Sequence, residues 1–128
     1  MAELHKECSI TTADKVGKLA EVTDKVKAAG VNIVALCAWT EGSTGKLLMV
    51  AEDPDKACQA VQPVVDKCEM REVVCVKAAN QPGALEEIAR KLADEGIGIE
   101  LCYATAAGGD QAAIILHTTD NAKAAQVV

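Results

Sequence analysis

The amino-acid sequence contains the same pattern twice. Three glycines each recur 66 positions further along the chain, at residues 17 and 83, 30 and 96, and 42 and 108. The match runs without a gap from the pair Ala13 and Ala79 to the pair Val61 and Val127. Two copies are too few and too long for a solenoid, so the repeat predicts a duplicated small domain. We place the first domain at residues 1–70 and the second at residues 71–128.

The composition limits both the core and the partners. A unit of about 60 residues buries only about 60% of its unfolded surface, so two such units gain stability by packing together. Phe is absent, and Trp39 and Tyr103 are the only aromatic residues, so the core is predicted to consist of Val, Ile, Leu, Ala and Cys. The net charge is −6 and no run of Lys or Arg occurs. This charge pattern argues against nucleic acid and against an anionic membrane as partners.

The N-terminal residues lack the apolar segment of a signal peptide, and no run of residues is long enough to span a membrane. We therefore expect a cytoplasmic protein. In that compartment the six cysteines are predicted to be reduced thiols that pack as small apolar side chains.

Each copy has the pattern of a strand, a helix, two strands and a second helix. In the first copy these elements are predicted at residues 8–12, 16–29, 31–40, 46–51 and from Asp53 to before Pro63. In the second copy they are predicted at residues 73–78, 84–95, 97–105, 112–118 and from a cap at Thr119 onward.

Residues 69–72 can give the first copy a closing fourth strand, whereas the second copy has no residues left for one. The predicted fold class is α+β. It consists of two tandem ferredoxin-like βαββαβ units, each an antiparallel sheet with both helices on one face, and the second unit lacks its last strand. We expect the missing strand to leave a sheet edge near residues 112–118 that is open or covered by another chain.

Catalytic and metal-binding residues are sparse. A cysteine nucleophile needs a histidine base, and the chain has only His5 and His117. The spacing of His5 and Cys8 suits a metal, but no further ligand pair completes a site. We predict no catalytic residue, no metal and no cofactor. A small thiol enzyme is the alternative, and it requires a cysteine of low pKa.

The turn before the helix of the second copy is better suited to bind a ligand than the segments around it. A proline stiffens the entry to the helix, a glycine admits a ligand close to the backbone, and the first N–H groups of the helix attract an anion such as a carboxylate. The same residues also suit a plain turn before a helix. The turn comprises Asn80, Gln81, Pro82, Gly83, Ala84 and Leu85.

The corresponding turn of the first copy differs. It keeps a glycine, Gly17, but has no proline and carries the acidic Asp14. Asp14 disfavours a bound carboxylate but can hold an ammonium group, so the second turn is predicted to be the better amino-acid site. Trp39 and Tyr103 either line a pocket or pack in the core.

The second turn, its helix and the following Gly96-Ile97-Gly98-Ile99 resemble the ACT domain, a small-molecule-sensing module of βαββαβ order. That family has a polar-x-Pro-Gly-x-Leu turn, followed by a helix and a strand that starts Gly-Ile/Val-Asn-Ile. The first copy matches the strand start as Gly30-Val31-Asn32-Ile33 but lacks the proline. The resemblance covers nearly the whole chain, so the protein looks like a free-standing tandem ACT protein.

The resemblance implies that ACT units pair side by side and that an amino acid binds at their seam. The turn of one unit and the second strand of its neighbour form such a site. Carried over to this chain, the turn residues are Asn80, Gln81, Pro82, Gly83, Ala84 and Leu85 in one copy and Asp14 and Gly17 in the other. The strand residues are Asn32, Val34 and Leu36, or Gly98, Glu100 and Cys102, and Glu100 is suited to an α-ammonium group.

We therefore expect a non-catalytic regulatory protein that binds an amino acid or a related small molecule at the seam. Binding would favour one arrangement of the units and so regulate a separate metabolic enzyme. A homodimer is expected from the unpaired sheet edge. The alternative is an interaction subunit that holds an enzyme partner without any ligand.

Overall fold

The computed structural model describes residues 2–128, and these residues form two compact units. The first unit is Lys6–Arg71. The second unit is Glu72–Val128 together with residues 2–5. The division into domains at residues 1–70 and 71–128 stays a proposal, since a compact unit is not the same as an independently folding domain.

The structure confirms the α+β class and the antiparallel, ferredoxin-like arrangement. The hydrogen-bonded order of the strands is β2-β3-β1-β4-β6-β5. In chain order the elements are β1 (Ala2–Ala13), α1 (Lys18–Ala28), β2 (Ile33–Glu41), β3 (Thr44–Ala51), α2 (Pro54–Val61), the short 3-10 helix η1 (Gln62–Val64), β4 (Lys67–Ala79), α3 (Ala84–Asp94), β5 (Ile99–Thr105), β6 (Gln111–Thr118) and α4 (Asn121–Val127).

Two strands are longer than the sequence predicts, and each serves both units. Strand β1 begins at Ala2, and its residues 2–5 belong to the second unit while its remainder belongs to the first. Strand β4 runs from the first unit into the second at Glu72. The predicted closing strand at residues 69–72 is therefore continuous with the first strand of the second repeat, as expected.

The prediction of an open sheet edge at residues 112–118 is wrong. Strand β6 lies between β4 and β5 and pairs antiparallel with both. In this topology the strand that follows the second helix lies beside the first strand of the unit, not beside the third. Within residues 2–128 no strand follows α4, and residues 2–5 of β1, the neighbour of β4 in the sheet order, lie in the second unit.

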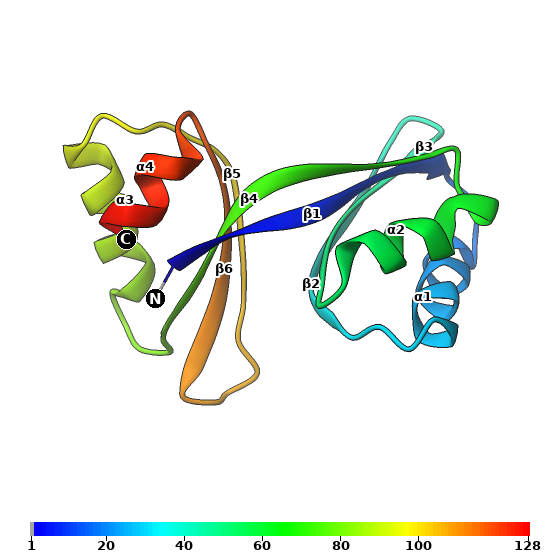
Figure 1. Ribbon diagram of the computed structural model, residues 1–128, viewed down its shortest axis with the longest axis horizontal. Coiled ribbons are helices and arrows are strands. Elements are labelled where there is room, and N and C mark those ends of the chain that lie inside the picture. The colour runs from blue at the N-terminus through cyan, green and yellow to red at the C-terminus, as the bar shows by residue number, and fades with distance from the viewer. Residues whose placement is uncertain (1) are drawn as a thin grey trace. The chain divides into compact units, whose positions relative to one another are not determined.

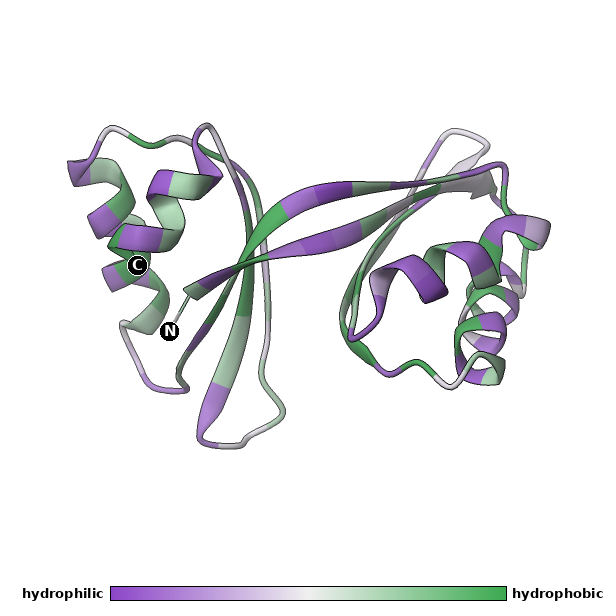
Figure 2. Ribbon diagram, viewed as in Figure 1, coloured by the Kyte–Doolittle hydropathy of each residue, from purple (hydrophilic) through white to green (hydrophobic). Residues whose placement is uncertain are grey.

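In the first unit, α1 and α2 cover one face of the strands (Figure 1). Helix α1 buries Val22 and Val26, which are one turn apart, and exposes Asp24 and Lys25 between them. Figure 2 shows this mixture of hydrophobic and hydrophilic residues around the helices. The side chains buried beneath the helices are Cys8, Ile10, Val22, Val26, Leu47, Met49, Ala51, Ala57, Cys58 and Val61.

The second unit repeats this core. Helix α3 buries Ile88 and Leu92 at the positions that match Val22 and Val26. The buried side chains of this core are Val74, Val76, Ile88, Leu92, Ile97, Ile114, Leu116 and Ala124. The duplication seen in the sequence is therefore a duplication of core positions.

The gap-free alignment of the repeats is wrong beyond the hairpin loop. Cys8 pairs with Met49 in the first unit, whereas its counterpart Val74 pairs with Leu116 in the second. Met49 thus corresponds to Leu116, 67 positions later, and not to Ile115. The loop between β5 and β6 contains one additional residue. The slip escaped the sequence comparison because both faces of β3 and β6 are apolar, so a shift of one residue still matches apolar with apolar.

The same shift corrects the cap of the last helix. Asp53 caps α2, with its Oδ1 accepting from the Lys56 N–H at 3.1 Å, as predicted. The cap of α4 is Asp120, whose Oδ1 accepts from the Lys123 N–H at 3.0 Å. The predicted cap, Thr119, instead accepts a hydrogen bond from the Gly98 N–H at 3.0 Å.

Candidate functional site

The two strand-to-helix turns have the same backbone conformation. Gly17 precedes α1 with a φ of 87°, and Gly83 precedes α3 with a φ of 86°. An L-residue with a Cβ atom is disfavoured in this left-handed region, so the position requires glycine. This requirement explains why the glycine is kept in both turns although the residues around it differ.

Asn80 holds the second turn in place. Its side-chain Nδ2 donates to the Gly109 carbonyl at 2.9 Å, and its backbone N–H donates to the Asp110 carbonyl at 2.9 Å. Both acceptors lie in the loop between β5 and β6. The observed role of Asn80 is therefore to tie the turn to this loop, and its predicted contact with a ligand stays a proposal.

The remaining predicted residues of this turn lie near a hollow of about 270 Å³, the second-turn hollow. Gln81 and Ala84 line it, whereas Pro82 and Leu85 are exposed at the surface. The hollow is lined by Val76, Lys77, Ala78, Ala79, Gln81, Ala84, Glu87, Ile88, Lys91 and Val128.

The start of α3 already carries negative charge. Glu86 and Glu87 occupy its first turn and pair with Arg90 at 2.7 Å and Lys91 at 3.4 Å. Carboxylates at this position interact favourably with the positive end of the helix. A bound anion would meet these two carboxylates, which the sequence analysis overlooked although both follow directly after Leu85.

The first turn borders a second depression, the first-turn hollow, of about 280 Å³. Its walls are the end of β1, the turn, the start of α1 and the facing parts of β2 and β3. It is lined by Thr12, Ala13, Asp14, Lys15, Gly17, Lys18, Leu19, Ala20, Ala38, Trp39, Thr40, Gly45, Lys46 and Leu47. The predicted residues Asp14 and Gly17 both lie in this lining.

Two lysines and one aspartate bring charged side chains to the first-turn hollow. Lys18 is fixed, because its Nζ donates to Glu21 Oε1 at 2.9 Å and to the Val64 carbonyl at 2.8 Å. The hydrogen bond from Lys18 lowers the pKa of Glu21. Lys15 is exposed. Lys46 Nζ donates to Thr11 Oγ1 at 3.4 Å, and its pairing with Thr11 and Trp39 places its side chain on the sheet face away from α1.

Trp39 pairs with Lys46 in the sheet, and Leu47, the next residue of β3, belongs to the core beneath the helices. Successive side chains of a strand point to opposite faces, so the Trp39 side chain lies on the face away from α1. Its Nε1 donates to Glu41 Oε1 at 2.9 Å. The pocket-lining interpretation of Trp39 stays a prediction. Tyr103, in β5, is half-buried and does not belong to the lining of the second-turn hollow.

The predicted strand residues lie apart from the turns. Asn32 precedes β2, donates from Nδ2 to Glu52 Oε1 at 3.4 Å, and lines a shallow depression with Thr23, Lys27, Gly30, Val31 and Ile33. Glu100 is exposed in β5 at the irregularity between Ile99 and Leu101. Neither residue lines the hollow of its own unit's turn.

Within residues 2–128, no group of three or more His, Cys, Asp or Glu side chains is arranged to hold a metal ion. Nor does any helix in this range have the length and apolar character needed to cross a membrane.

Two units of βαββα order with paired glycine turns define a tandem ACT protein. The chain belongs to the ACT domain family, because the model of an ACT domain pair matches residues 4–128.

Known structures have the same fold. A Bacteroides thetaiotaomicron protein is 31% identical, with a TM-score of 0.87 over 98% of this chain and 87% of that chain. The ligand-free regulatory subunit of aspartate kinase from Thermus thermophilus is 16% identical, with a TM-score of 0.70 over 98% of this chain and 93% of that chain. The corresponding subunit from Thermus flavus is 17% identical, with a TM-score of 0.67 over 99% and 90%. No curated protein matches significantly.

Proposed function

We propose that this protein is a non-catalytic regulator that binds a free amino acid or a closely related small molecule in the first-turn hollow. The observation that carries the proposal is the hollow itself, which brings Asp14, Lys15 and the start of α1 together. The membership in the ACT family supports a regulatory role. The fold shared with regulatory subunits of aspartate kinase is consistent with it.

The lining offers a partner for each part of an amino acid. Lys15 can pair with the α-carboxylate, and the carboxylate of Asp14 can accept from the α-ammonium group. Leu19 and Ala38 provide apolar surface for a side chain. A volume of about 280 Å³ lies at the small end of ligand pockets, which suits a metabolite of this size.

This assignment reverses the order expected from the sequence, which favoured the second turn. The lysines of the first turn offset Asp14, whereas Glu86 and Glu87 occupy the helix start of the second. The second-turn hollow, with Gln81 and Ala84, remains a candidate for a second site. Contacts from Asn32 and Glu100, the seam between paired units, the homodimer and the cytoplasmic location also remain proposals.

A thermal-shift screen against the twenty amino acids tests the function. A ligand at about 100 times its Kd adds about 2.7 kcal/mol of stability to the state that binds it. We expect at least one amino acid to raise the Tm of the wild-type protein. The absence of a shift with every amino acid would contradict the proposal.

Two matched variants locate the site. Lys15→Met keeps the length of the side chain in the first-turn hollow but removes the charge, and it should reduce the ligand-induced shift. Lys91→Met makes the same change in the second-turn hollow and should leave the shift intact. The reverse result would move the site to the second turn.

The alternative of a ligand-free interaction subunit has one observation in its favour. Val16 is fully exposed at the first turn, and Leu19 and Leu85 are exposed to 47% and 46% at matching positions of α1 and α3. Such side chains suit a protein partner. This alternative predicts no amino-acid shift, together with stable binding to a metabolic enzyme.

A further inference from the structure

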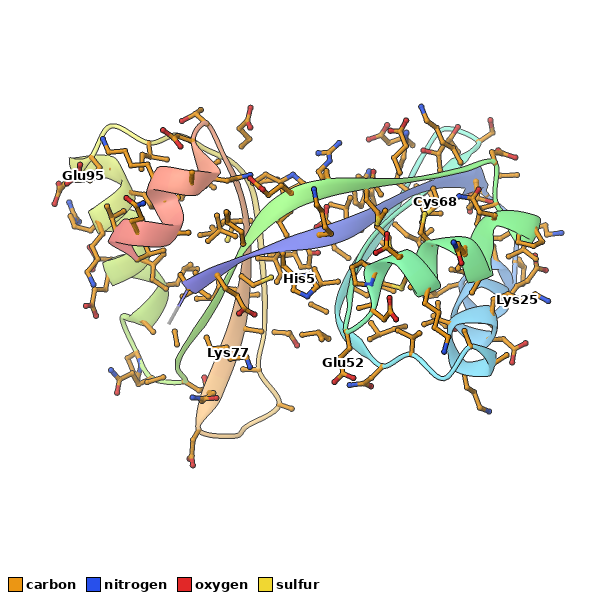
Figure 3. The ribbon with its side chains drawn as sticks, in the orientation of Figure 1. His5, Lys25, Glu52, Cys68, Lys77 and Glu95 are labelled. Carbon is orange, nitrogen blue, oxygen red and sulfur yellow. The ribbon has the colours of Figure 1, made fainter. Side chains whose placement is uncertain are left out.

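Three of the six cysteines come together in the first unit although they are far apart in the sequence. Cys8 lies in β1 and Cys58 in α2. Cys68, labelled in Figure 3, lies at the start of β4. We call these three the thiol cluster. All three are free thiols, and the Sγ atoms of Cys58 and Cys68 are 2.7 Å apart. In the sequence Cys58 and Cys68 are separated by Pro63, before which the helix is predicted to end.

The polar contacts around the pair keep the two sulfurs close. The Cys58 thiol is also 3.3 Å from the Cys68 carbonyl. The Gln62 side-chain Nε2 donates to the same carbonyl at 3.4 Å and to Cys58 Sγ at 3.6 Å. Because Gln62 spans both residues, the approach of α2 to β4 at this point is fixed by several contacts.

The contacts within the thiol cluster also shift the pKa values of Cys8 and Cys68. The hydrogen bond from the Cys68 thiol lowers the pKa of Cys8, with a smaller contribution in the same direction from Cys58. Burial and the negative charges of Glu7 and Asp55 act in the opposite direction. The contact with Cys8 raises the pKa of Cys68. The ionised form of Cys8 is therefore favoured over that of Cys68.

We propose that Cys58 and Cys68 are a redox modification site that closes to an intramolecular disulfide when a hydroperoxide oxidises the protein. A disulfide needs its sulfurs at about 2.04 Å, so the pair must approach by only about 0.7 Å from the observed 2.7 Å. Cys68 is half-buried, so an oxidant can reach it. Cys58 is 7% exposed, so it is expected to react second, with the oxidised Cys68.

The chemistry balances with hydrogen peroxide as the oxidant. The sulfur of the Cys68 thiol attacks one peroxide oxygen, the O–O bond breaks, and the leaving hydroxide takes up the Cys68 thiol proton to become water. The product is a sulfenic acid, S–OH, on Cys68. The sulfur of Cys58 then attacks this sulfur, the S–O bond breaks, and the hydroxide leaves with the Cys58 thiol proton as a second water. The two thiols have together lost two electrons and two protons, which is two hydrogen atoms.

The bond would close the loop that contains η1. The carbonyl of Val64, within this loop, accepts the hydrogen bond from Lys18 of the first-turn hollow. Oxidation therefore stiffens the support of one lysine in that hollow. This last consequence rests on the proposed function, whereas the disulfide itself does not.

The test is a peptide map of the wild-type full chain. The protein is reduced, treated with excess hydrogen peroxide, alkylated and digested with trypsin without reduction. Cleavage after Lys56, Lys67 and Arg71 places Cys58 and Cys68 on separate peptides. We expect these two peptides to be linked, the intact mass to fall by two hydrogen atoms, and dithiothreitol to reverse both changes.

Variants distinguish the proposed pair from other reactions. Cys68→Ser should abolish the mass loss, and the exposed Cys102→Ser should leave it unchanged. Cys8→Ser should retain the link between residues 58 and 68. A link from Cys8 to Cys68, a disulfide between two chains, or oxygen addition without any link would each overturn the proposal. The wild-type map decides the question even where a variant folds poorly.

Discussion

Gly17 and Gly83 show how a single residue determines the local structure in both halves of the chain. Their φ angles of 87° and 86° set the direction in which each helix leaves its strand. A Cβ atom built on either residue would have nothing within 4 Å. The requirement for glycine is therefore a matter of backbone conformation and not of space.

Replacing Gly83 tests whether the left-handed backbone conformation requires glycine. Gly83→Ala should lower the free energy of unfolding by about 1 to 2 kcal/mol, because the left-handed conformation disfavours a Cβ. Gly109→Ala is the matched control. Gly109 also has open space at its Cβ position, but its φ lies outside the left-handed region, so little change is expected. Urea denaturation of the three proteins gives the comparison, and equal losses in both variants would contradict the argument.

The sequence predicted the position of the turns better than their chemistry. The glycine pairs and the starts of α2 and α3 follow from local rules, and the structure has them where expected. The composition of the first-turn hollow did not follow, because Leu47 reaches it from β3 and Ala38 from β2. Residues from separate strands meet there only through the fold, so a comparison of the turns alone missed both.

At the scale of secondary-structure elements, one additional residue in the second hairpin loop shifts everything that follows. Helix α2 starts at Pro54 and helix α4 at Asn121, and the caps Asp53 and Asp120 are likewise 67 positions apart. The order and types of the elements were predictable from hydrophobic periodicity. The shift was not, because Leu47–Ala51 and Ile114–Thr118 are buried on both faces and carry little alternation.

The corrected register predicts that the two caps are equivalent. Asp53→Ala and Asp120→Ala should each cost about 1 kcal/mol, since each removes one side-chain acceptor from a helix start. Asp24→Ala, an exposed change within α1, serves as the control and should cost nothing because alanine favours the helix. Thermal unfolding followed by circular dichroism measures the three variants. A loss for Asp53→Ala without a similar loss for Asp120→Ala would argue against the equivalence.

At the scale of the whole molecule, the N-terminal residues of β1 supply a strand to the second unit. Residues 2–5 lie in the second unit, and Ala2 packs against its core. The sequence did not indicate this, because the pairing joins residues more than sixty positions apart and local alternation in residues 2–5 is weak. The number of strands in each copy was predictable from the sequence. Which segment lies beside β4 in the second unit was not, because it depends on how distant strands pair.

Deletion of residues 2–5 should therefore destabilise the second unit more than the first. The deletion takes away the neighbour of β4 on that side, and each lost ladder hydrogen bond costs about 1 kcal/mol. We expect the second unit to lose on the order of 2 kcal/mol. Hydrogen exchange should accelerate at residues 73–79 and 111–118, while the amides of α1 keep their protection.

The double variant Glu3→Thr and Leu4→Thr is the control for this deletion. Both side chains are exposed, and threonine keeps the backbone and favours a strand, so the exchange pattern of the wild-type protein should persist. If the deletion leaves exchange in β4 unchanged, residues 2–5 are not the closing strand of the second unit. If the double variant behaves like the deletion, the side chains rather than the backbone ladder hold the strand. If exchange in β4 is faster in the deletion variant but not in the double variant, the backbone of residues 2–5 is the strand that pairs with β4 in the second unit.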